Sequence, residues 1–321
     1  MANFWQNLKA PFYVLAPMAG FTDYAFRSVC KDFGADVLYS EMASATALYY
    51  SKNSVDSETL RLVRSNENER PYIVQLFGSV PSHFSAAVKI IEENIRPDGI
   101  DINFGCPVKK VAKQGAGAVL MDDKKKAREI IKTTIGSTDL PISIKTRTKA
   151  GKTDVLTFLD FVGDLDIKAL MIHGRTLVQG FSGDIDTAII RKSRDYFSGK
   201  IIANGGIDSF EIAARILKES AADGLGVARG ALGRPWIFEE IAKGRQMRIS
   251  QEKVFEIIRK HAESAQAEKG DAGIVEMRKH LCWYARGHKN ASAIRRKMIT
   301  VENLADIYSL ENDFVHASLL Y

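Results

Sequence analysis

Residues 167–176 read IKALMIHGRT, a short apolar run that stops at a histidine, a glycine and an arginine. Apolar side chains at successive positions are typical of a parallel β-strand, because helices cover both faces of such a sheet. We therefore predict a strand over 169–173. Seven more short runs of this kind predict strands over 13–16, 37–39, 73–76, 99–103, 142–145, 201–204 and 224–227.

Amphipathic stretches separate these runs. Their apolar residues recur at helical spacing in SHFSAAVKIIEEN (82–94), DDKKKAREIIKTTI (122–135) and SFEIAARILKES (209–220). Eight strand-then-helix units are typical of an α/β protein with a closed (β/α)8 barrel, the TIM barrel. A doubly wound parallel sheet is the alternative, but no clear G-x-G-x-x-G follows the first strand to support it. We predict a (β/α)8 TIM barrel over residues 1–244.

The pattern changes towards the C-terminus. From Ser250 onward the periodicity is helical and no run predicts a strand. We expect Ser250 to cap a long helix that ends near the GDAG break at 270–273. Further helical segments are expected through Tyr284 and around 292–304. The prediction for residues 245–321 is a small C-terminal all-α domain.

The composition is that of an ordinary globular protein. Of 321 residues, 45% are hydrophobic and 26% are charged, which excludes long disorder, collagen and coiled coil. No apolar run approaches the ~18 residues that span a bilayer, and the N-terminus lacks the pattern of a secretory signal. Three cysteines, far apart in sequence, give no disulfide framework and no metal-ligand spacing. We expect a cytoplasmic monomer with no membrane contact and no bound metal.

The net charge of +6 is concentrated in one block. Residues 245–301 hold 13 Lys and Arg against 6 Asp and Glu, whereas residues 1–244 hold 32 against 29. Within 278–300, seven cations occur without an acid, which indicates a polyanion as partner. Four rings interleave with them and could stack on unpaired bases, and the alternative for Trp283 and Tyr284 is a place in the core. The cations are Arg278, Lys279, Arg286, Lys289, Arg295, Arg296 and Lys297, and the rings are His280, Trp283, Tyr284 and His288.

Polar and glycine residues gather where the predicted strands end. Active sites of (β/α)8 barrels lie at this end, so these residues are candidates for the site. The last two strands form the usual phosphate corner, and Asn204-Gly205-Gly206 with Ala228-Arg229 offers amides and a cation there. A cofactor that bears a phosphate fits this corner. The other strand ends carry Pro17, Met18, Ala19, Gln75, Asn103, Lys145, Arg147 and His173.

Four side chains at or just beyond the strand ends suggest a chemistry. Lys145 could stabilise negative charge on a reduced flavin, form a Schiff base or make an ion pair. His173 either serves the same purpose or is a structural histidine. The carboxamide of Gln75 can pair with a ring edge that has both a donor and an acceptor. Cys106, in a Gly-Cys-Pro loop beyond the strand 99–103, is mostly protonated at neutral pH and can donate a proton.

Several strings occur in one order along the chain: APMAGFTD (16–23), SEM (40–42), INFGCP (102–107), HGRT (173–176), ANGG (203–206) and RGALGRPWIF (229–238). They resemble the tRNA-dihydrouridine synthases, and RKHLCWY (278–284) is most similar to the bacterial B-type branch of that family. The resemblance covers nearly the whole chain. It implies an FMN-containing (β/α)8 barrel followed by a helical RNA-binding domain.

The resemblance also implies roles for single residues. The family commonly has Asp where Gly206 stands, which leaves open any contact made by that side chain. From the basic stretch and the strand ends we add Arg147, Arg278, Lys279, Arg295 and Arg296 as candidates for RNA binding. The implied FMN contacts are Pro17, Met18, Ala19, Gln75, Lys145 and His173; the phosphate loop is Asn204, Gly205, Gly206, Ala228 and Arg229; the general acid is Cys106, and Asn103 lies near the target base.

We therefore predict an FMN-dependent tRNA-dihydrouridine synthase. NADPH or NADH would reduce FMN, and hydride would pass from the flavin to C6 of a uridine in tRNA that has left its stack. Cys106 would deliver a proton to C5. Two alternatives stay open. A flavin barrel that acts on free pyrimidines needs no basic helices, and a non-catalytic tRNA-binding protein needs neither Cys106 nor Lys145 nor the phosphate loop.

Overall fold

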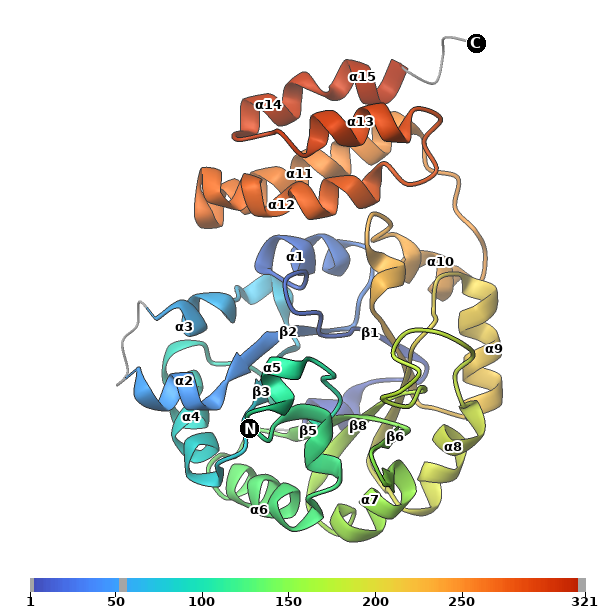
Figure 1. Ribbon diagram of the computed structural model, residues 1–321. Coiled ribbons are helices and arrows are strands. Elements are labelled where there is room, and N and C mark those ends of the chain that lie inside the picture. Colours follow the sequence, from blue (N-terminus) through green and yellow to red (C-terminus); the bar gives the residue numbers. More distant parts are fainter. Residues whose placement is uncertain (1–2, 52–56, 317–321) are drawn as a thin grey trace.

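Eight parallel strands close into a barrel in a computed structural model that describes residues 3–51 and 57–316. The spatial order of the strands follows their order in the chain, and the last strand pairs with the first to close the ring. Figure 1 shows the barrel with helices around it. The prediction of a (β/α)8 barrel is confirmed. Its strands are β1 (Phe12–Leu15), β2 (Val37–Ser44), β3 (Tyr72–Phe77), β4 (Gly99–Asn103), β5 (Ile142–Arg147), β8 (Ile167–His173), β9 (Lys200–Asn204) and β10 (Gly224–Val227).

Helices follow the strands and cover the outside of the barrel (Figure 1). The three helices predicted from amphipathic spacing are present as α4 (Pro81–Asn94), α6 (Lys124–Ile135) and α9 (Phe210–Ser220). A small hairpin of β6 (Lys149–Ala150) and β7 (Thr153–Asp154) follows β5 and was not expected. The other barrel helices are α1 (Tyr24–Asp32), α2 (Ala45–Tyr50), α3 (Glu58–Leu62), α5 (Lys109–Ala112), α7 (Val155–Val162), α8 (Thr187–Lys192) and α10 (Ile237–Lys243).

Side-chain caps fix where several of these helices begin. At α1 the Asp23 carboxylate accepts a hydrogen bond from the Phe26 N–H at 2.9 Å, and at α7 the Asp154 carboxylate accepts one from the Thr157 N–H at 2.8 Å. Such a cap contributes about 0.5–2 kcal/mol to stability. The loops that leave the barrel mouth at β1 and β5 therefore end at defined points.

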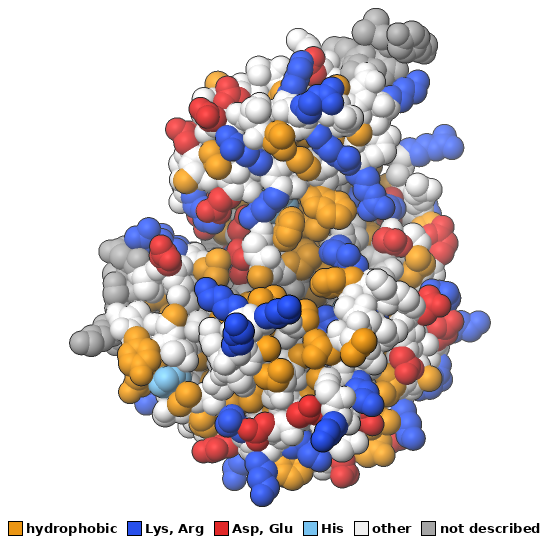
Figure 2. All heavy atoms as spheres, viewed as in Figure 1, with side chains coloured by type: hydrophobic (Ala, Val, Ile, Leu, Met, Phe, Trp, Pro, Cys, Tyr) orange, Lys and Arg blue, Asp and Glu red, His pale blue; other side chains and the backbone are white. Residues whose placement is uncertain are grey.

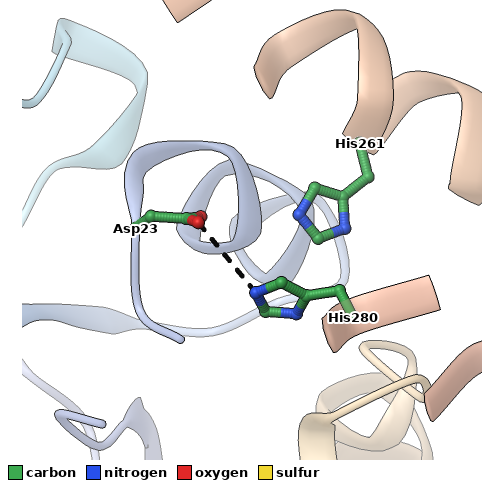
Figure 3. A group of neighbouring side chains, drawn as sticks. All are labelled: Asp23, His261 and His280. Carbon is green, nitrogen blue, oxygen red and sulfur yellow. Dashed lines mark ion pairs between the residues drawn. The ribbon is translucent and has the colours of Figure 1, made fainter. Parts of the chain in front are cut away.

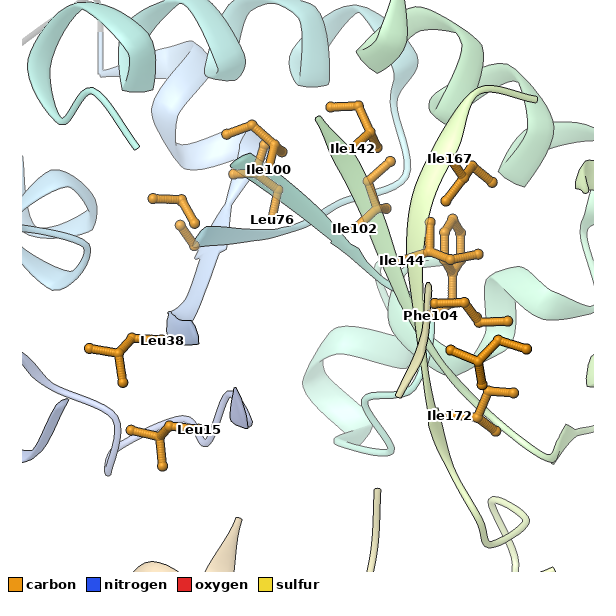
Figure 4. Close-up of a cluster of buried hydrophobic side chains, with 14 of the residues drawn as sticks. Leu15, Leu38, Leu76, Ile100, Ile102, Phe104, Ile142, Ile144, Ile167 and Ile172 are labelled. Atoms are coloured by element: carbon orange, nitrogen blue, oxygen red, sulfur yellow. The ribbon is translucent and has the colours of Figure 1, made fainter. Parts of the chain in front are cut away.

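Apolar side chains pack on both sides of the strands. On the outer side they lie under the helices, as Figure 4 shows for Leu38, Ile102 and Ile172 among others. On the inner side, the N-terminal part of the barrel is filled by a second cluster, in which the Trp5 ring lies 6.0 Å from that of Phe12. Polar side chains are thereby left for the C-terminal strand ends. The inner cluster is completed by Val14, Ala16, Val37, Tyr39, Ile73, Ala169, Met171 and Ile202.

Up to residue 316, where the described part of the chain ends, five further helices follow the barrel, as the C-terminal periodicity predicts. The Ser250 hydroxyl accepts a hydrogen bond from the Lys253 N–H at 3.3 Å, so the predicted cap is confirmed, and Gly270 ends this helix with φ of 61°. The five helices share a core in which the Phe255 and Phe314 rings lie 5.7 Å apart. They are α11 (Gln251–Lys269), α12 (Asp271–Tyr284), α13 (Ala291–Met298), α14 (Leu304–Ser309) and α15 (Glu311–His316).

The C-terminal helices sit against one side of the barrel, where α11 packs on α1 (Figure 1). The expected domain boundary between 244 and 245 falls in the connection from α10 to α11 and stays a prediction. Among residues 3–51 and 57–316, no helix combines the length and the apolar character needed to cross a membrane.

Candidate active site

The polar residues at the strand ends meet at one end of the barrel. Gln75, Asn103, Lys145, His173 and Asn204 come from β3, β4, β5, β8 and β9, and all except Lys145 are at most 7% exposed. Asn103 Nδ2 donates to Gln75 Oε1 at 2.8 Å, and Lys145 Nζ donates to Asn204 Oδ1 at 3.1 Å. Five residues that are far apart in the sequence thus form one polar cluster at the barrel mouth.

Lys145 is the cation of this cluster. Its partner Asn204 is held in turn, because Asn204 Nδ2 donates to the Gly226 carbonyl at 2.6 Å. Burial, and after it the Arg147 guanidinium, lowers the pKa of Lys145 to about 8. Lys145 is therefore mostly charged at pH 7 and can stabilise negative charge that develops in the mouth.

His173 is neutral. Burial, followed by the nearby cations Lys145 and Arg147, lowers its pKa to about 2. Its Nε2 lies 3.4 Å from a terminal nitrogen of Arg175, which can only donate a hydrogen bond. Nε2 is therefore the acceptor and Nδ1 carries the proton, so the ring offers an N–H donor without a charge.

The phosphate corner is built on β9 and β10. Gly205 and Gly206 have φ of 116° and 68°, which favour glycine. A Cβ on Gly205 would lie 2.7 Å from His173 Cδ2, so no side chain fits there. Ala228 precedes Arg229, which is exposed and starts the short turn η5 (Arg229–Ala231). Because β9 and β10 are paired, the Gly205–Gly206 backbone and Arg229 follow neighbouring strand ends.

Arg175, which follows the strand end at His173 but was not among the predicted site residues, adds a second guanidinium to the corner. It is 8% exposed, and its Nε donates to the Gly183 carbonyl at 2.8 Å. Burial, followed by Arg229, lowers the pKa of Arg175. A Cβ on Gly206 would lie 3.3 Å from this guanidinium, so an Asp at that position would face Arg175. Two neighbouring guanidinium groups suit an anion.

The turn after β1 forms part of the rim. Pro17 and Met18 are half-buried, and Ala19 is exposed. The turn is held by Thr22, because the Met18 N–H donates to the Thr22 hydroxyl at 3.1 Å and the Thr22 N–H donates to the Met18 carbonyl at 3.0 Å. The three predicted residues therefore present a fixed stretch of backbone at the mouth.

Cys106 lies in the loop between β4 and α5 and is partly exposed. Its N–H donates to Asn103 Oδ1 at 2.9 Å, and the Gly105 N–H donates to the same oxygen at 3.0 Å. Burial raises the pKa of the Cys106 thiol, so the thiol is protonated at neutral pH. By contrast, Cys30 is fully buried in the core and Cys282 is half-buried on α12.

Arg147, expected to bind RNA, faces inward and is only 2% exposed. Its Nε donates to the Gly105 carbonyl at 2.8 Å, and its Nη1 donates to the Thr176 and Gly180 carbonyls at 3.1 Å each. The guanidinium thus joins the Cys106 loop to the loop after β8. This placement favours a bracing role over contact with a polyanion.

Two of the cations predicted to bind RNA also hold the C-terminal helices together. Arg278 Nε donates to the Val301 carbonyl at 2.7 Å, and Arg295 Nε donates to the Cys282 carbonyl at 3.0 Å. Both side chains are half-buried, so they combine a structural bond with partial exposure.

The other two cations predicted to bind RNA, Lys279 and Arg296, are not bonded to backbone carbonyls in the way that Arg278 and Arg295 are, among the residues that the structure describes. Lys279 is half-buried with its Nζ 5.7 Å from the centre of the Phe21 ring, and Arg296 is exposed. Figure 2 shows Lys and Arg side chains around the hollow between the barrel and the C-terminal helices. Exposed cations next to the Cys106 loop are Lys109, Lys110 and Lys113.

Three of the four interleaved rings are core residues. His280, Tyr284 and His288 are 0%, 4% and 6% exposed, so they are not available for stacking on bases. Trp283 is half-buried and packs against the barrel. Its backbone lies so close to Gly233 that a Cβ there would be 2.3 Å from the Trp283 carbonyl oxygen. Core packing, the alternative left open above for Trp283 and Tyr284, therefore holds for Tyr284, and the two histidines are core residues as well.

Asp23, His261 and His280 meet where α1 contacts α11 and α12, which no sequence pattern indicated (Figure 3). One polar atom of each lies within 4.8 Å of the others. A common centre then lies at most about 2.8 Å from each atom, which is within hydrogen-bond distance of a water. Burial lowers the pKa of His261 to about 4 and that of His280 to about 3, so both rings are neutral. We interpret the group as a contact between the barrel and the helices.

Comparison with known proteins gives one consistent result. The family model for dihydrouridine synthase (Dus) matches residues 14–317. The chain is 35% identical to tRNA-dihydrouridine synthase B of Vibrio parahaemolyticus, over 90% of this chain and 91% of that protein. It is 29% identical to a probable tRNA-dihydrouridine synthase of Aquifex aeolicus, over 98% of this chain and 99% of that protein. The old yellow enzyme from Trypanosoma cruzi is similar in fold alone, with a TM-score of 0.53 at 11% identity over 75% of this chain and 92% of that one. The chain belongs to the dihydrouridine synthase family.

Proposed function

We propose that this protein reduces the C5–C6 double bond of specific uridines in tRNA, with FMN as its flavin and NADPH or NADH as the reductant. The observation that carries the proposal is the barrel mouth, where one polar cluster lies between a corner with two guanidinium groups and a protonated thiol. Membership of the dihydrouridine synthase family supports the reaction type.

The chemistry of the mouth fits FMN. Lys145, Arg175 and Arg229 supply positive charge, and His173 supplies a neutral N–H donor. When bound and reduced, FMN supplies the hydride that C6 of uracil accepts. The ring would be held by Pro17, Met18, Ala19, Gln75, Lys145 and His173, and the phosphate by Asn204, Gly205, Gly206, Ala228 and Arg229.

Cys106 would supply the second hydrogen of the reduction. Hydride addition at C6 leaves negative charge on the uracil, and a proton from the Cys106 thiol at C5 removes it. The resulting thiolate regains a proton from water. Because burial raises the pKa of this thiol, it keeps its proton until the uracil takes it. Asn103 holds the loop that presents the thiol and lies next to where the base would enter.

The basic C-terminal helices support tRNA, rather than a free pyrimidine, as the substrate. A free base carries no phosphates, so its binding needs no positively charged surface. A tRNA carries many phosphates, and a positively charged surface binds them. The protonated Cys106 and the charged Lys145 at the mouth favour an enzyme over a protein that only binds tRNA. The residues proposed to meet RNA phosphates are Arg278, Lys279, Arg295 and Arg296. We also place the protein in the cytoplasm, in keeping with its three free cysteines.

Two measurements test this function. The purified protein is expected to show flavin absorbance and to release FMN on denaturation, and release of FAD would contradict the cofactor assignment. Mapping of dihydrouridine in RNA from a strain that lacks the gene, with and without the gene restored, identifies the uridines. Unchanged dihydrouridine in that strain would contradict the activity, and a colourless protein that binds tRNA would favour the non-catalytic alternative.

Arg229→Ala tests the phosphate corner. The substitution removes one charged contact to the phosphate, which is worth roughly 1.5–3 kcal/mol, so FMN should bind about 10- to 150-fold more weakly. The measurement is a fluorescence titration of the apoprotein with FMN. Arg191 is an exposed barrel cation whose guanidinium donates to carbonyls at the end of α9, so it provides the control variant Arg191→Ala, for which FMN affinity should not change.

A further inference from the structure

A chain of buried polar side chains runs along the inside of the barrel below Cys106. Asp101, on β4, is fully buried, and each of its carboxylate oxygens accepts one hydrogen bond. Oδ1 accepts from the Ser143 hydroxyl and Oδ2 from Gln75 Nε2, both at 2.7 Å. Gln75 Oε1 accepts from Asn103 Nδ2, and Asn103 Oδ1 accepts from the backbone of the Cys106 loop. Asp101 is thus connected to the thiol loop through two carboxamides.

The hydrogen bonds of this chain run in one direction. An ionised carboxylate only accepts hydrogen bonds, so Gln75 must turn its NH2 towards Asp101 and its oxygen towards Asn103. Asn103 must then donate to that oxygen, which leaves its own oxygen free for the loop N–H groups. The acceptor at one end of the chain therefore determines which atom the other end presents to the loop.

A carboxylate is an unfavourable residue for this place. The interiors of such barrels are filled mainly by Val, Ile and Leu, and here Ile73, Met171 and Ile202 follow that pattern. Burial raises the pKa of Asp101 to about 6, so the side chain is mostly ionised at pH 7 and above. An aliphatic side chain would avoid the desolvation of a charge, but it would leave Gln75 without a fixed orientation.

We infer that Asp101 is a positioning residue for the reduction, which sets the direction of the Gln75 and Asn103 carboxamides and so holds the loop that presents Cys106. Gln75 and Asn103 then each keep one fixed orientation at the base of the mouth. The inference rests on the proposed function for its catalytic meaning, whereas the orientation of the chain can be tested without tRNA.

Exchanging the two end groups of the chain tests its direction. In Asn103→Asp alone, the new carboxylate faces an oxygen of Gln75, and turning Gln75 over only moves the repulsion to Asp101. In the double variant Asp101→Asn/Asn103→Asp, the new amide at position 101 donates to Gln75 Oε1, and Gln75 Nε2 donates to the new carboxylate at position 103. That carboxylate still accepts from the loop N–H groups. Both hydrogen bonds of Gln75, to the side chains at positions 101 and 103, are then restored with donor and acceptor exchanged.

Alkylation of Cys106 by iodoacetamide at pH 8, followed by mass spectrometry of the holoprotein, reports on the loop. We expect Asn103→Asp to raise the rate at least fivefold and the double variant to return it to within twofold of the wild type, with Cys282 as the internal reference. A double variant as reactive as Asn103→Asp, or an unchanged rate in Asn103→Asp, would overturn the inference.

A second pair of variants covers the case in which Asn103→Asp does not fold. Asp101→Asn can still present an oxygen to Gln75, while Asp101→Leu cannot, so alkylation should accelerate only in Asp101→Leu. With tRNA as substrate, Asp101→Leu should lower kcat at least tenfold with little change in KM, and Asp101→Asn should keep kcat within fivefold. Equal alkylation rates and equal kcat in both variants would overturn the inference. If the variants show the expected alkylation pattern but no protein reduces tRNA, the hydrogen-bond chain from Asp101 to the Cys106 loop is supported and the proposed function is refuted.

Discussion

Burial acts on Cys106 and Lys145 in the same sense, because it favours the uncharged form of each. For the cysteine this means a raised pKa and a thiol that keeps its proton. For the lysine it means a pKa lowered to about 8, so that its positive charge is lost only slightly above neutral pH. The barrel mouth therefore holds both a thiol that keeps its proton and a cation whose pKa lies close to neutral pH.

Replacement of Cys106 by Ala separates the two halves of the reaction. The thiol is proposed to serve only the uracil, so FMN should stay bound and NADPH should still reduce it. Turnover on tRNA should fall about 10²- to 10⁴-fold, which is the usual contribution of a positioned acid. Stopped-flow absorbance of the flavin measures both halves. Cys282→Ala is the control, and near-normal turnover in Cys106→Ala would disprove the assignment.

The pKa of Lys145 gives the apoprotein a pH-dependent affinity for FMN. The charged form is present below about pH 8 and attracts an anionic ligand, so affinity should be level from pH 6.5 to 7.5. Above pH 8 the charge is lost, and affinity should fall by up to about tenfold per pH unit. Fluorescence quenching of FMN measures the profile. Lys145→Met should bind more weakly at pH 7 and show no fall up to pH 9, and a parallel fall in that variant would assign the effect to another group.

At the scale of single elements, the turn after β9 shows how tightly the corner is built. Gly205 combines a positive φ with a Cβ position that would lie only 2.7 Å from His173 Cδ2. Gly180, in the loop after β8, has φ of 59° but nothing within 4 Å of the place where a Cβ would stand. The two glycines therefore separate the effect of backbone strain from that of a steric clash.

Gly205→Ala and Gly180→Ala make a matched pair. Gly180→Ala adds backbone strain alone and should lower the free energy of unfolding by about 1 kcal/mol. Gly205→Ala adds a clash with His173 and should lower it by roughly 2–4 kcal/mol, with loss of bound FMN. Urea unfolding and flavin content of the purified proteins measure both effects. Equal losses of stability with full FMN content in both variants would show that the corner tolerates a side chain.

Sequence patterns predicted the elements better than their ends. All eight barrel strands follow from apolar runs, but β2 continues to Ser44 although its apolar run stops at 39. The reason is that Ser40 and Glu41 are buried polar residues, which hydropathy cannot distinguish from loop residues. For the same reason the burial of Asp101 inside the barrel was not predicted, since the sequence does not show which residues hydrogen-bond to a carboxylate in a strand.

Most of the candidate site was predicted from the rule that the active site of a (β/α)8 barrel lies where its strands end, because this rule needs only the positions of the strand ends. It gave Gln75, Lys145 and His173 their correct place together at the mouth. It could not show that His280 and Tyr284 are buried, because their burial depends on the docking of α12 against α1, a contact between distant parts of the chain.

At the scale of the whole molecule, the charge of the C-terminal helices and the rim of the barrel face one hollow (Figure 2). An extended polyanion that enters the hollow would touch both parts at once. Binding to such a surface releases counterions and weakens with salt in proportion to the number of phosphates held.

Neutralising the C-terminal cations should therefore change the salt dependence of tRNA binding. For the wild type we expect a log–log slope of roughly −2 to −4. Substitution of four residues by Gln should bring the slope closer to zero and raise KM for tRNA, while FMN content stays unchanged; Gln keeps a donor for the Val301 and Cys282 carbonyls. The four are Arg278, Lys279, Arg295 and Arg296.

The control for this experiment removes charge elsewhere. Lys125 and Lys126 are exposed cations at the start of α6, on the outside of the barrel. Lys125→Gln/Lys126→Gln should leave both the slope and KM as in the wild type. If the four-residue variant and this control behave alike, the helices do not dock RNA and a free pyrimidine becomes the better substrate.

The closure of the barrel by β1 and β10 has a consequence for how the protein is made. Phe12 pairs with Gly224, 212 positions later in the chain. At the usual speed of a ribosome, roughly 10–40 s pass between the synthesis of these two residues. During that time the nascent β1 has only β2 as a neighbour, and its other edge presents unpaired N–H and C=O groups. The residues proposed to hold FMN span Pro17 to Arg229, so a newborn chain acquires its cofactor pocket only as the last barrel strand emerges.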